Sequence, residues 1–470
     1  MIFKNTFWLG VGTGINKLLS LALVMYAARV LGAEGYGKFS FALAFASLLM
    51  IFSDLGLSHI ITREFAREEK KEDLYSLVSL KIVLACATFF LLSVVSLFTV
   101  EARDVQVIIL SLSVFLLANS LLGIFYSFFH ARQKMEYEAW LEALQAAMIF
   151  GFGLFVLLRF PSPEHLSYAY VYSALVALGV TLAFFHWKVF PLKLKWDFLV
   201  WKKYLAMSWP LALVGLFGML YSYTDSVMLG YWGMLEETGW YNAAYKIVTA
   251  SLVPMGLIGA SFYPALSKFS MESKEAFQKM WNHELETMIA LALPLVIGGI
   301  VLAEKIVESF YSFDFAPAAL ALQILSLTVG VIFLYRPMND ALIVFNQQKK
   351  TFWVTALGAL VNVVLNVILI PAYSLYGAAV ATVVTHALVL CSMTLLVRNF
   401  TPIKVPFLRV FLTFCVSAFA ISAMYLALQQ LLAYDLHLFP LVLAGAAAYA
   451  LTFFVLRQYI AVKYFKHLYA

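Results

Sequence analysis

Long apolar runs, separated by short stretches that hold charges, prolines or polar clusters, dominate the hydrophobic pattern of the chain. Each run has about the 20 residues that a helix needs to cross a bilayer. They predict fourteen spanning helices, near residues 6 to 28, 38 to 61, 76 to 99, 106 to 129, 138 to 158, 166 to 188, 206 to 229, 240 to 264, 284 to 303, 317 to 345, 351 to 371, 375 to 397, 406 to 427 and 437 to 457. The pattern therefore predicts an all-α polytopic membrane protein.

Composition agrees with this fold class. Hydrophobic residues make up 63% of the 470 positions and charged residues 12%, about half the share that is typical of soluble domains. The net charge of +6 would suggest nucleic acid as a partner of a soluble protein, but here the basic residues sit in short loops between apolar runs. Membrane topology explains them better, so we expect membrane lipids and no nucleic acid as partners.

The loops predict the orientation, because most lysines and arginines fall in one alternate set of loops, which includes both termini. The other set holds only five cations, Arg29, Lys38, Arg103, Arg159 and Lys305. By the positive-inside rule we expect a multi-pass protein of the cell membrane with both termini in the cytoplasm.

Internal repetition predicts two halves. The turn that holds Glu34 and Gly35 after the first run resembles the turn that holds Glu237 and Gly239 after the seventh. Turns six helices apart lie on the same side of the membrane, which predicts a parallel repeat of six spans. We therefore expect an N-terminal lobe at 1–190, a C-terminal lobe at 206–400 and two additional helices with a tail at 401–470.

The connector at 191–205 is basic and interleaved with aromatic residues. This composition predicts a cytoplasmic amphipathic segment that lies on the anionic inner leaflet. A solvated, charged connector is the alternative.

A few ionisable side chains fall inside the predicted spans. Lys17 lies twelve residues from Arg29, roughly 18 Å below the outer end of its helix at about 1.5 Å per residue. A charge at that depth costs at least ~2.5 kcal/mol unless it faces protein or water. We therefore expect Lys17 to line a polar cavity and bind substrate; a structural salt bridge and a misplaced span are the alternatives.

The second half carries two more deep cations. Lys246 lies at a depth similar to that of Asp225 on the preceding helix, so the two side chains either pair or line the cavity. Arg336 is followed four residues later by Asp340. An i,i+4 ion pair is one interpretation, and a phosphate ligand is the other, because the guanidinium group matches phosphate oxygens.

Lys81 and Asp54 complete the set. Lys81 lies near the cytoplasmic end of its span, so it either snorkels to the interface or binds substrate. Asp54 needs a partner at its depth, which Lys81 or Arg336 would supply. We predict Lys17, Lys81, Lys246 and Arg336 as substrate-binding residues, and Asp54, Asp225 and Asp340 as coupling or ion-pair residues.

The excess of cations over acids favours an anionic ligand. Polar uncharged residues also occur inside spans, and we expect them mainly to tie helices together by hydrogen bonds. They are Asn16, Asn119, Gln145, Asn362, Asn366 and His386.

Catalytic chemistry has no support in the sequence. No phosphate-binding P-loop occurs, no metal-ligand cluster is visible, and the loops are too short for a catalytic domain. We predict a transporter with no catalytic residue, no metal and no cofactor, driven by a gradient of a coupling ion such as H⁺ or Na⁺, by the membrane potential or by consumption of the transported molecule outside.

Three motifs carry a resemblance to a known family: ARVLGAEGYGKFSFALAF at 28–45, the DLGL that begins at Asp54, and GWYNAAYK at 239–246. With fourteen spans they resemble the polysaccharide transporter branch of the multidrug/oligosaccharidyl-lipid/polysaccharide exporter superfamily, the Wzx-type flippases. The resemblance implies two pseudo-symmetric six-helix lobes around a central cavity, alternating access and a polyprenyl-pyrophosphate-linked oligosaccharide as substrate.

Three functions remain in competition. The first is a flippase that moves this lipid-linked oligosaccharide to the outer leaflet, working as a monomer with glycan-assembly proteins as partners. The second is a cation-coupled multidrug exporter of the same architecture. The third is a membrane-embedded glycosyltransferase or polymerase, which the short loops disfavour.

Overall fold

The computed structural model describes residues 2–68, 71–189, 191–434 and 436–463, and in these ranges it is built of helices. It divides into two compact units, residues 1–242 and 243–470. The helices are α1 (Ile2–Leu49), α2 (Ile51–Asp54), α3 (Leu57–Arg67), α4 (Lys71–Thr99), α5 (Arg103–Ala131), α6 (Met135–Arg159), α7 (Pro163–Lys188), α8 (Phe198–Tyr231), α9 (Leu235–Ser251), α10 (Val253–Glu272), α11 (Lys274–Val301), α12 (Ala303–Phe310), the 3₁₀ helix η1 (Phe313–Phe315), α13 (Ala318–Val344), α14 (Gln348–Phe400), α15 (Phe407–Leu432) and α16 (Leu438–Lys463).

Twelve helical segments in the described part of the chain are long and apolar enough to cross a membrane. Two of them, at 14–67 and 348–400, are 54 and 53 residues long, enough for two spans each. The backbone is non-helical inside both, at Gly32 and at Ser374, where φ is 71° and 53°. The all-α membrane fold is thus as predicted, while the number of fourteen spans stays a prediction.

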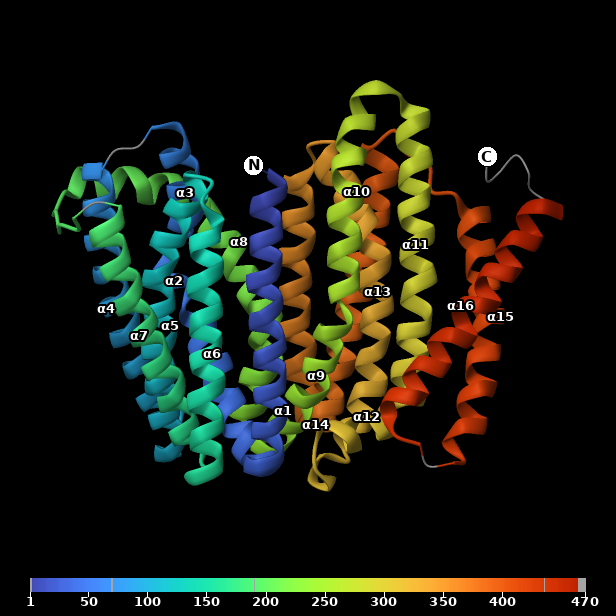
Figure 1. Cartoon of the computed structure of the whole chain (residues 1–470), viewed down its shortest axis with the longest axis horizontal. Coiled ribbons are helices and arrows are strands. Elements are labelled where there is room, and N and C mark those ends of the chain that lie inside the picture. The colour runs from blue at the N-terminus through green and yellow to red at the C-terminus, as the bar shows by residue number, and fades with distance from the viewer. Residues whose placement is uncertain (1, 69–70, 190, 435, 464–470) are drawn as a thin grey trace. The chain divides into compact units, whose positions relative to one another are not determined.

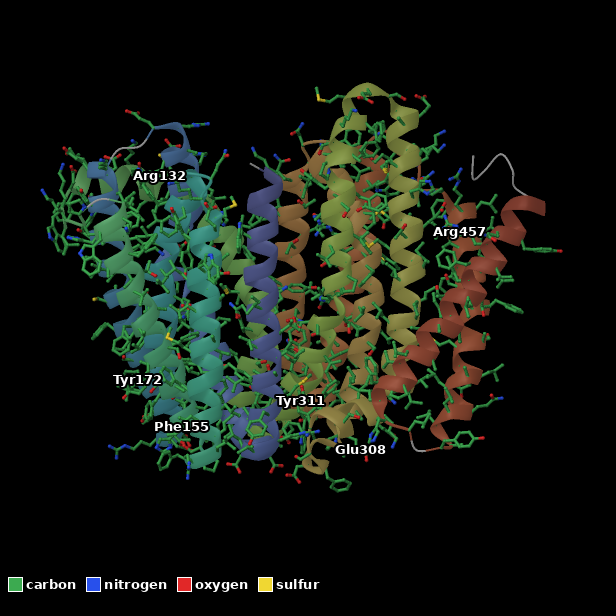
Figure 2. All side chains as sticks on the ribbon, in the orientation of Figure 1. Arg132, Phe155, Tyr172, Glu308, Tyr311 and Arg457 are labelled. Carbon is green, nitrogen blue, oxygen red and sulfur yellow. The ribbon has the colours of Figure 1, made fainter. Side chains whose placement is uncertain are left out.

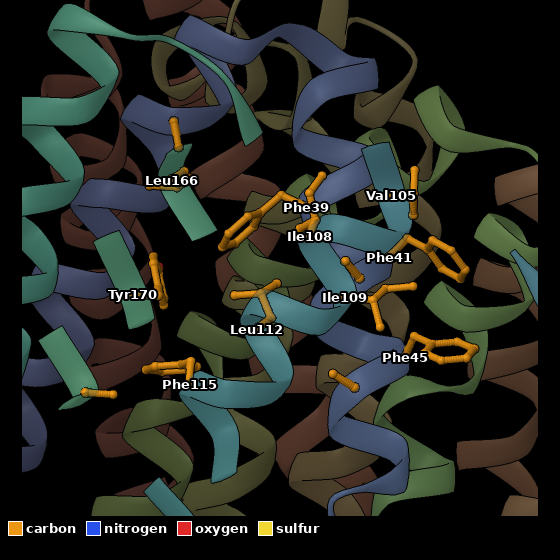
Figure 3. Close-up of a cluster of buried hydrophobic side chains, with 14 of the residues drawn as sticks. Phe39, Phe41, Phe45, Val105, Ile108, Ile109, Leu112, Phe115, Leu166 and Tyr170 are labelled. Carbon is orange, nitrogen blue, oxygen red and sulfur yellow. The ribbon is translucent and has the colours of Figure 1, made fainter. Parts of the chain in front are cut away.

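The first unit packs α1, α5 and α7 around a core of apolar side chains. In Figure 3, Phe39 and Tyr170 lie close to Leu112 and Phe115, and the Phe115 and Tyr170 rings meet edge to face with centroids 5.1 Å apart. Large rings are thus buried against aliphatic side chains, as in other close-packed protein interiors.

The second unit contains the α11 and α13 pair and the neighbouring α15 and α16, which lie side by side (Figure 1). Trp281 is fully buried and donates from Nε1 to the backbone oxygen of Pro337, 2.9 Å away, which ties α11 to α13. Pro337 has no N–H, so the helical hydrogen bond to the carbonyl of Phe333 is lost, while the indole makes an additional bond to the carbonyl of Pro337 itself.

The predicted continuous helices at 38–61 and 240–264 are wrong in detail, because each is broken. The first breaks at Leu55 and Gly56, with φ of 47° and 75°. The second breaks at Leu252, just before Pro254. A Cβ on Gly56 would lie 2.8 Å from the Cβ of Leu211, so α8 passes the break too closely for a side chain. The first break places Asp54 at the end of α2.

The outside of the helices is largely apolar. Phe155 on α6 and Tyr172 on α7 are 58% and 64% exposed (Figure 2). Such a surface is stable against lipid tails and unstable against water.

The predicted connector at 191–205 is partly extended and partly helical: 191–197 has no helix, and α8 begins at Phe198, capped by the side chain of Asp197. Within this connector the side chain of Lys195 donates to Glu72, 2.5 Å away, and this contact raises the pKa of Lys195. The lobe boundaries predicted from the sequence stay predictions.

Candidate functional site

Lys17 lies in the first half of α1 and its side chain is exposed. It makes no hydrogen bond or ion pair to any residue that the structure describes. The predicted salt-bridge alternative therefore finds no partner among those residues. An unpaired ammonium group on an apolar helix requires contact with water or with an anion.

Lys81 on α4 is buried, with 1% of its side chain exposed, so it does not snorkel. Its Nζ donates to Asp54 Oδ1 at 2.5 Å and to Ser120 Oγ at 2.8 Å. Asp54 also accepts from Ser58 Oγ at 2.6 Å. The buried cation and the aspartate at the helix break thus balance each other in a closed network, which ties α2, α4 and α5 together.

Arg336 and Asp340 on α13 form the i,i+4 pair that the sequence suggested, with Nε to Oδ2 at 2.8 Å. Only 2% of the Asp340 side chain is exposed, against 30% of that of Arg336. Gly259 on α10 leaves the space that the guanidinium group fills, because a Cβ there would lie 3.0 Å from Nη2. The terminal nitrogens of Arg336 make no hydrogen bond to a described residue, so they can bind an anion.

Glu284 on α11 is the site residue that the sequence analysis missed. It is fully buried, and its two carboxylate oxygens make no hydrogen bond to a donor among the described residues. It interacts with the buried carboxyl group of Asp340 on α13, the helix against which α11 packs. The sequence held one signal that Glu284 lies inside a helix. Ser273 caps the N-terminus of α11 by accepting a hydrogen bond from the backbone N–H of Ala276, so the helix begins ten residues before Glu284.

Lys246 and Asp225 lie in different units. Within its own unit, Lys246 on α9 makes no ion pair with a described residue. Asp225 on α8 is buried and accepts a hydrogen bond from the hydroxyl of Tyr241. Their pairing stays a prediction.

A polar cavity of about 380 Å³ lies inside the first unit, and one of the residues that line it, Asn16, directly precedes Lys17 in the chain. Asn16 from α1, Asn119 and Tyr126 from α5, and Glu142 and Gln145 from α6 line it. Gln145 donates to Asn119 Oδ1 at 2.7 Å, one of the helix-to-helix contacts expected of polar residues inside spans. Among the described residues that line it, the cavity combines neutral polar and apolar side chains with one carboxylate and has no cation.

A larger cavity of about 670 Å³ lies inside the second unit and is mostly apolar. Its walls come from α9, α11, α13, α15 and α16, and include Pro294, Gly298, Leu428, Phe453 and Arg457. Arg457, labelled in Figure 2, pairs with Glu286 at 3.3 Å. An elongated apolar molecule with a negatively charged end suits such a space.

No group of three or more histidine, cysteine or acidic side chains in the described part of the chain is arranged to hold a metal ion. The three cysteines, Cys86, Cys391 and Cys415, are exposed and unpaired.

Comparison with protein families gives a match over residues 2–270 to the polysaccharide biosynthesis protein family. The chain is 22% identical over 373 residues to the probable low-salt glycan biosynthesis flippase Agl15 of Haloferax volcanii, covering 77% of this chain and 76% of that protein. It is 24% identical over 407 residues to a putative O-antigen transporter of Escherichia coli K12, covering 84% and 96%.

Solved structures share the fold. The lipid II flippase MurJ in an inward closed conformation matches with a TM-score of 0.79 at 16% identity, covering 96% of this chain and 99% of that one. An inward-facing multidrug resistance transporter of the MATE family matches with a TM-score of 0.67 at 13% identity, covering 88% and 99%. At these identities the likeness concerns the architecture alone.

Proposed function

Because the chain belongs to the polysaccharide biosynthesis protein family, we propose that it flips a lipid-pyrophosphate-linked oligosaccharide from the cytoplasmic to the outer leaflet by alternating access. It is a transporter with the fold of flippases and not an enzyme. In this proposal cations in a central cavity bind the pyrophosphate group of the substrate, and the oligosaccharide crosses the membrane without contact with lipid tails.

The observation that carries the proposal is Lys17. An exposed ammonium group without a described partner, on a helix that is apolar enough to span a membrane, is unfavourable in lipid and favourable beside a phosphate. The terminal nitrogens of Arg336 offer a second anion contact, and Lys246 a third. Charge-assisted hydrogen bonds of this kind contribute about 1.5–3 kcal/mol each, or roughly ten-fold or more in affinity.

The test is a flipping assay in proteoliposomes with a fluorescent polyprenyl-pyrophosphate oligosaccharide, read by quenching of the outer leaflet. Lys17→Ala, Lys246→Ala and Arg336→Ala are each expected to lower the rate at least about ten-fold. Lys17→Arg keeps the charge and is expected to retain most of the rate. Arg159→Ala, at an exposed helix end, is the matched control for loss of a cation. Wild-type rates in all three alanine variants would refute the cationic cavity.

We assign the apolar cavity of the second unit to the polyprenyl tail of the substrate, because the walls of this cavity are mostly apolar. Gly298 lines this cavity, and a Cβ built on it meets nothing within 4 Å, so a larger side chain would project into open space. Gly298→Phe is expected to slow flipping of a long-chain substrate more than of a short-chain one. Gly179→Phe, at an exposed helix position with equally open surroundings, is the control. Equal slowing of both chain lengths would refute this assignment.

One observation favours the second function, export of cationic drugs. In its described lining, the polar cavity of the first unit has the carboxylate of Glu142 and no cation, and the fold is also that of multidrug transporters. Loss of drug resistance with unchanged glycan export on deletion of the gene, reproduced by Glu142→Gln, would favour that function over ours.

A further inference from the structure

Charge balance distinguishes two buried clusters at corresponding places in the two units. Lys81 and Glu284 each lie ten positions after the lysine that begins its helix, α4 in one unit and α11 in the other. Around Lys81 the charges are one ammonium and one carboxylate, Asp54. Around Glu284 they are two carboxylates and a single guanidinium group, that of Arg336. The first cluster is neutral, whereas the second has a net charge of −1.

An uncompensated negative charge is costly at this depth. Glu284 is fully buried, and the Asp340 side chain is 2% exposed. Two neighbouring carboxyl groups in a poorly solvated site do not both ionise, because each disfavours the charge of the other. A single proton between them neutralises the cluster, and it also turns two acceptors into a donor and an acceptor, which satisfies the unpaired oxygens of Glu284.

Other charges around the pair are engaged elsewhere. Glu286, two residues along α11, is held by Arg409 of α15 and Arg457 of α16. Facing α13 from α14, the imidazole ring of His386 stacks on Tyr335 with centroids 6.1 Å apart.

On α10, Gly259 lies against the cluster and contributes no charge, because glycine has no side chain. Lys268 on the same helix pairs with Glu272, 3.7 Å away, at the end of the helix. At the far end of α11, Lys305 of α12 is 3.5 Å from Glu308. Arg336 is therefore the cation that faces the carboxyl pair among the described residues.

We propose that Glu284 and Asp340 form a proton-binding site whose occupancy controls the access of the substrate pyrophosphate to Arg336. Without the proton, two carboxylates attract the guanidinium group and hold it. With the proton bound, a single carboxylate remains, and the partly exposed Arg336 is freer to bind phosphate oxygens. Proton and pyrophosphate binding then favour each other by linkage.

A proton suits this site better than a sodium ion. A metal cation at the carboxyl pair would lie beside the guanidinium group, and like charges repel in a poorly solvated site.

This inference rests on the proposed function for the role of Arg336, but the proton itself is measured separately. Infrared spectra of the purified full-length protein in nanodiscs report protonated carboxyl groups. We expect a protonated carboxyl band near neutral pH that Glu284→Gln removes, as does Asp340→Asn if the first variant folds poorly. Glu286→Gln, whose parent carboxylate is paired with arginines, is expected to keep the band.

Linkage is measured by calorimetry with farnesyl pyrophosphate as the probe and farnesol as the uncharged control. In the alkaline range, where the probe is already fully ionised, wild-type affinity is expected to fall by up to about ten-fold per pH unit, with proton uptake on binding. Glu284→Gln is expected to bind at least as tightly as the wild type, with no uptake.

The two ideas fail differently. Absence of the infrared band in the wild type, or its survival in both Glu284→Gln and Asp340→Asn, overturns the proton site, as does probe binding without proton uptake. Sodium-dependent binding of the probe that both variants abolish would also overturn it, in favour of a metal site. Failure of farnesyl pyrophosphate to bind, with the band present and lost in the variants, supports the proton site and contradicts the recognition of pyrophosphate by Arg336.

Discussion

Removing either member of the Lys81 and Asp54 pair is expected to destabilise the fold by different amounts. The side chain of Lys81 is 1% exposed and that of Asp54 is 28% exposed. Asp54→Ala leaves a buried ammonium group with only Ser120 as a partner, which costs about 3–5 kcal/mol, as for other broken buried pairs. Lys81→Met leaves a carboxylate that water reaches in part, and we expect the smaller cost of about 1–3 kcal/mol.

The double variant Asp54→Ala with Lys81→Met removes both charges, so it is expected to recover most of the loss caused by Asp54→Ala alone. The assay is equilibrium unfolding in mixed micelles, followed by tryptophan fluorescence, with all four members of the double-mutant cycle in the same micelle. Equal costs for the two single variants would refute the burial argument. A double variant no more stable than Asp54→Ala would show that the ammonium group is not the source of the instability.

Three glycines give further predictions, each checked by thermal stability of the purified protein. A Cβ on Gly37 would lie 1.8 Å from the backbone oxygen of Leu235, so Gly37→Ala is expected to abolish folded protein. Gly14 has open space around it, so Gly14→Ala is expected to be neutral or to stabilise by up to about 1 kcal/mol. Similar stability of the two variants would contradict the close approach at Gly37. Gly56→Ala is expected to cost about 1–3 kcal/mol, because φ is 75° there and Leu211 leaves no room; a cost below about 0.5 kcal/mol would mean that the break at Gly56 is not strained.

The contact at Gly37 also gives a physical reason for two of the sequence motifs that pointed to the family. Gly37 belongs to the first motif and Gly239 to the third. A Cβ on Gly239 would lie 2.2 Å from the backbone oxygen of Ala33. The glycines of the two motifs thus allow the start of α9 and the second part of α1 to touch through their backbones, which no other residue type permits.

Helix breaks were beyond the reach of the hydrophobic pattern. An apolar run looks the same whether or not the helix inside it is interrupted, so the runs at 38–61 and 240–264 suggested continuous helices. Pro254 was a local signal for the second break. For the first, the packing of α8 against Gly56 decides the backbone, and sequence periodicity carries no information about that contact.

By itself the sequence determined the class of the protein, because the excess of apolar residues and the length of the runs leave no other way to satisfy the backbone than helices in a membrane. It also offered the pair of Arg336 and Asp340 as one of two interpretations, since residues four apart on a helix are neighbours whatever the fold. For Asp54 the sequence offered Lys81 or Arg336 as a partner, and tertiary structure chose Lys81. The burial of Glu284 and its approach to Asp340 were decided by tertiary structure alone. Helices that are far apart in the chain bring those groups together, so only their packing decides which charges are balanced. In our proposal it also decides which carboxyl groups bind a proton.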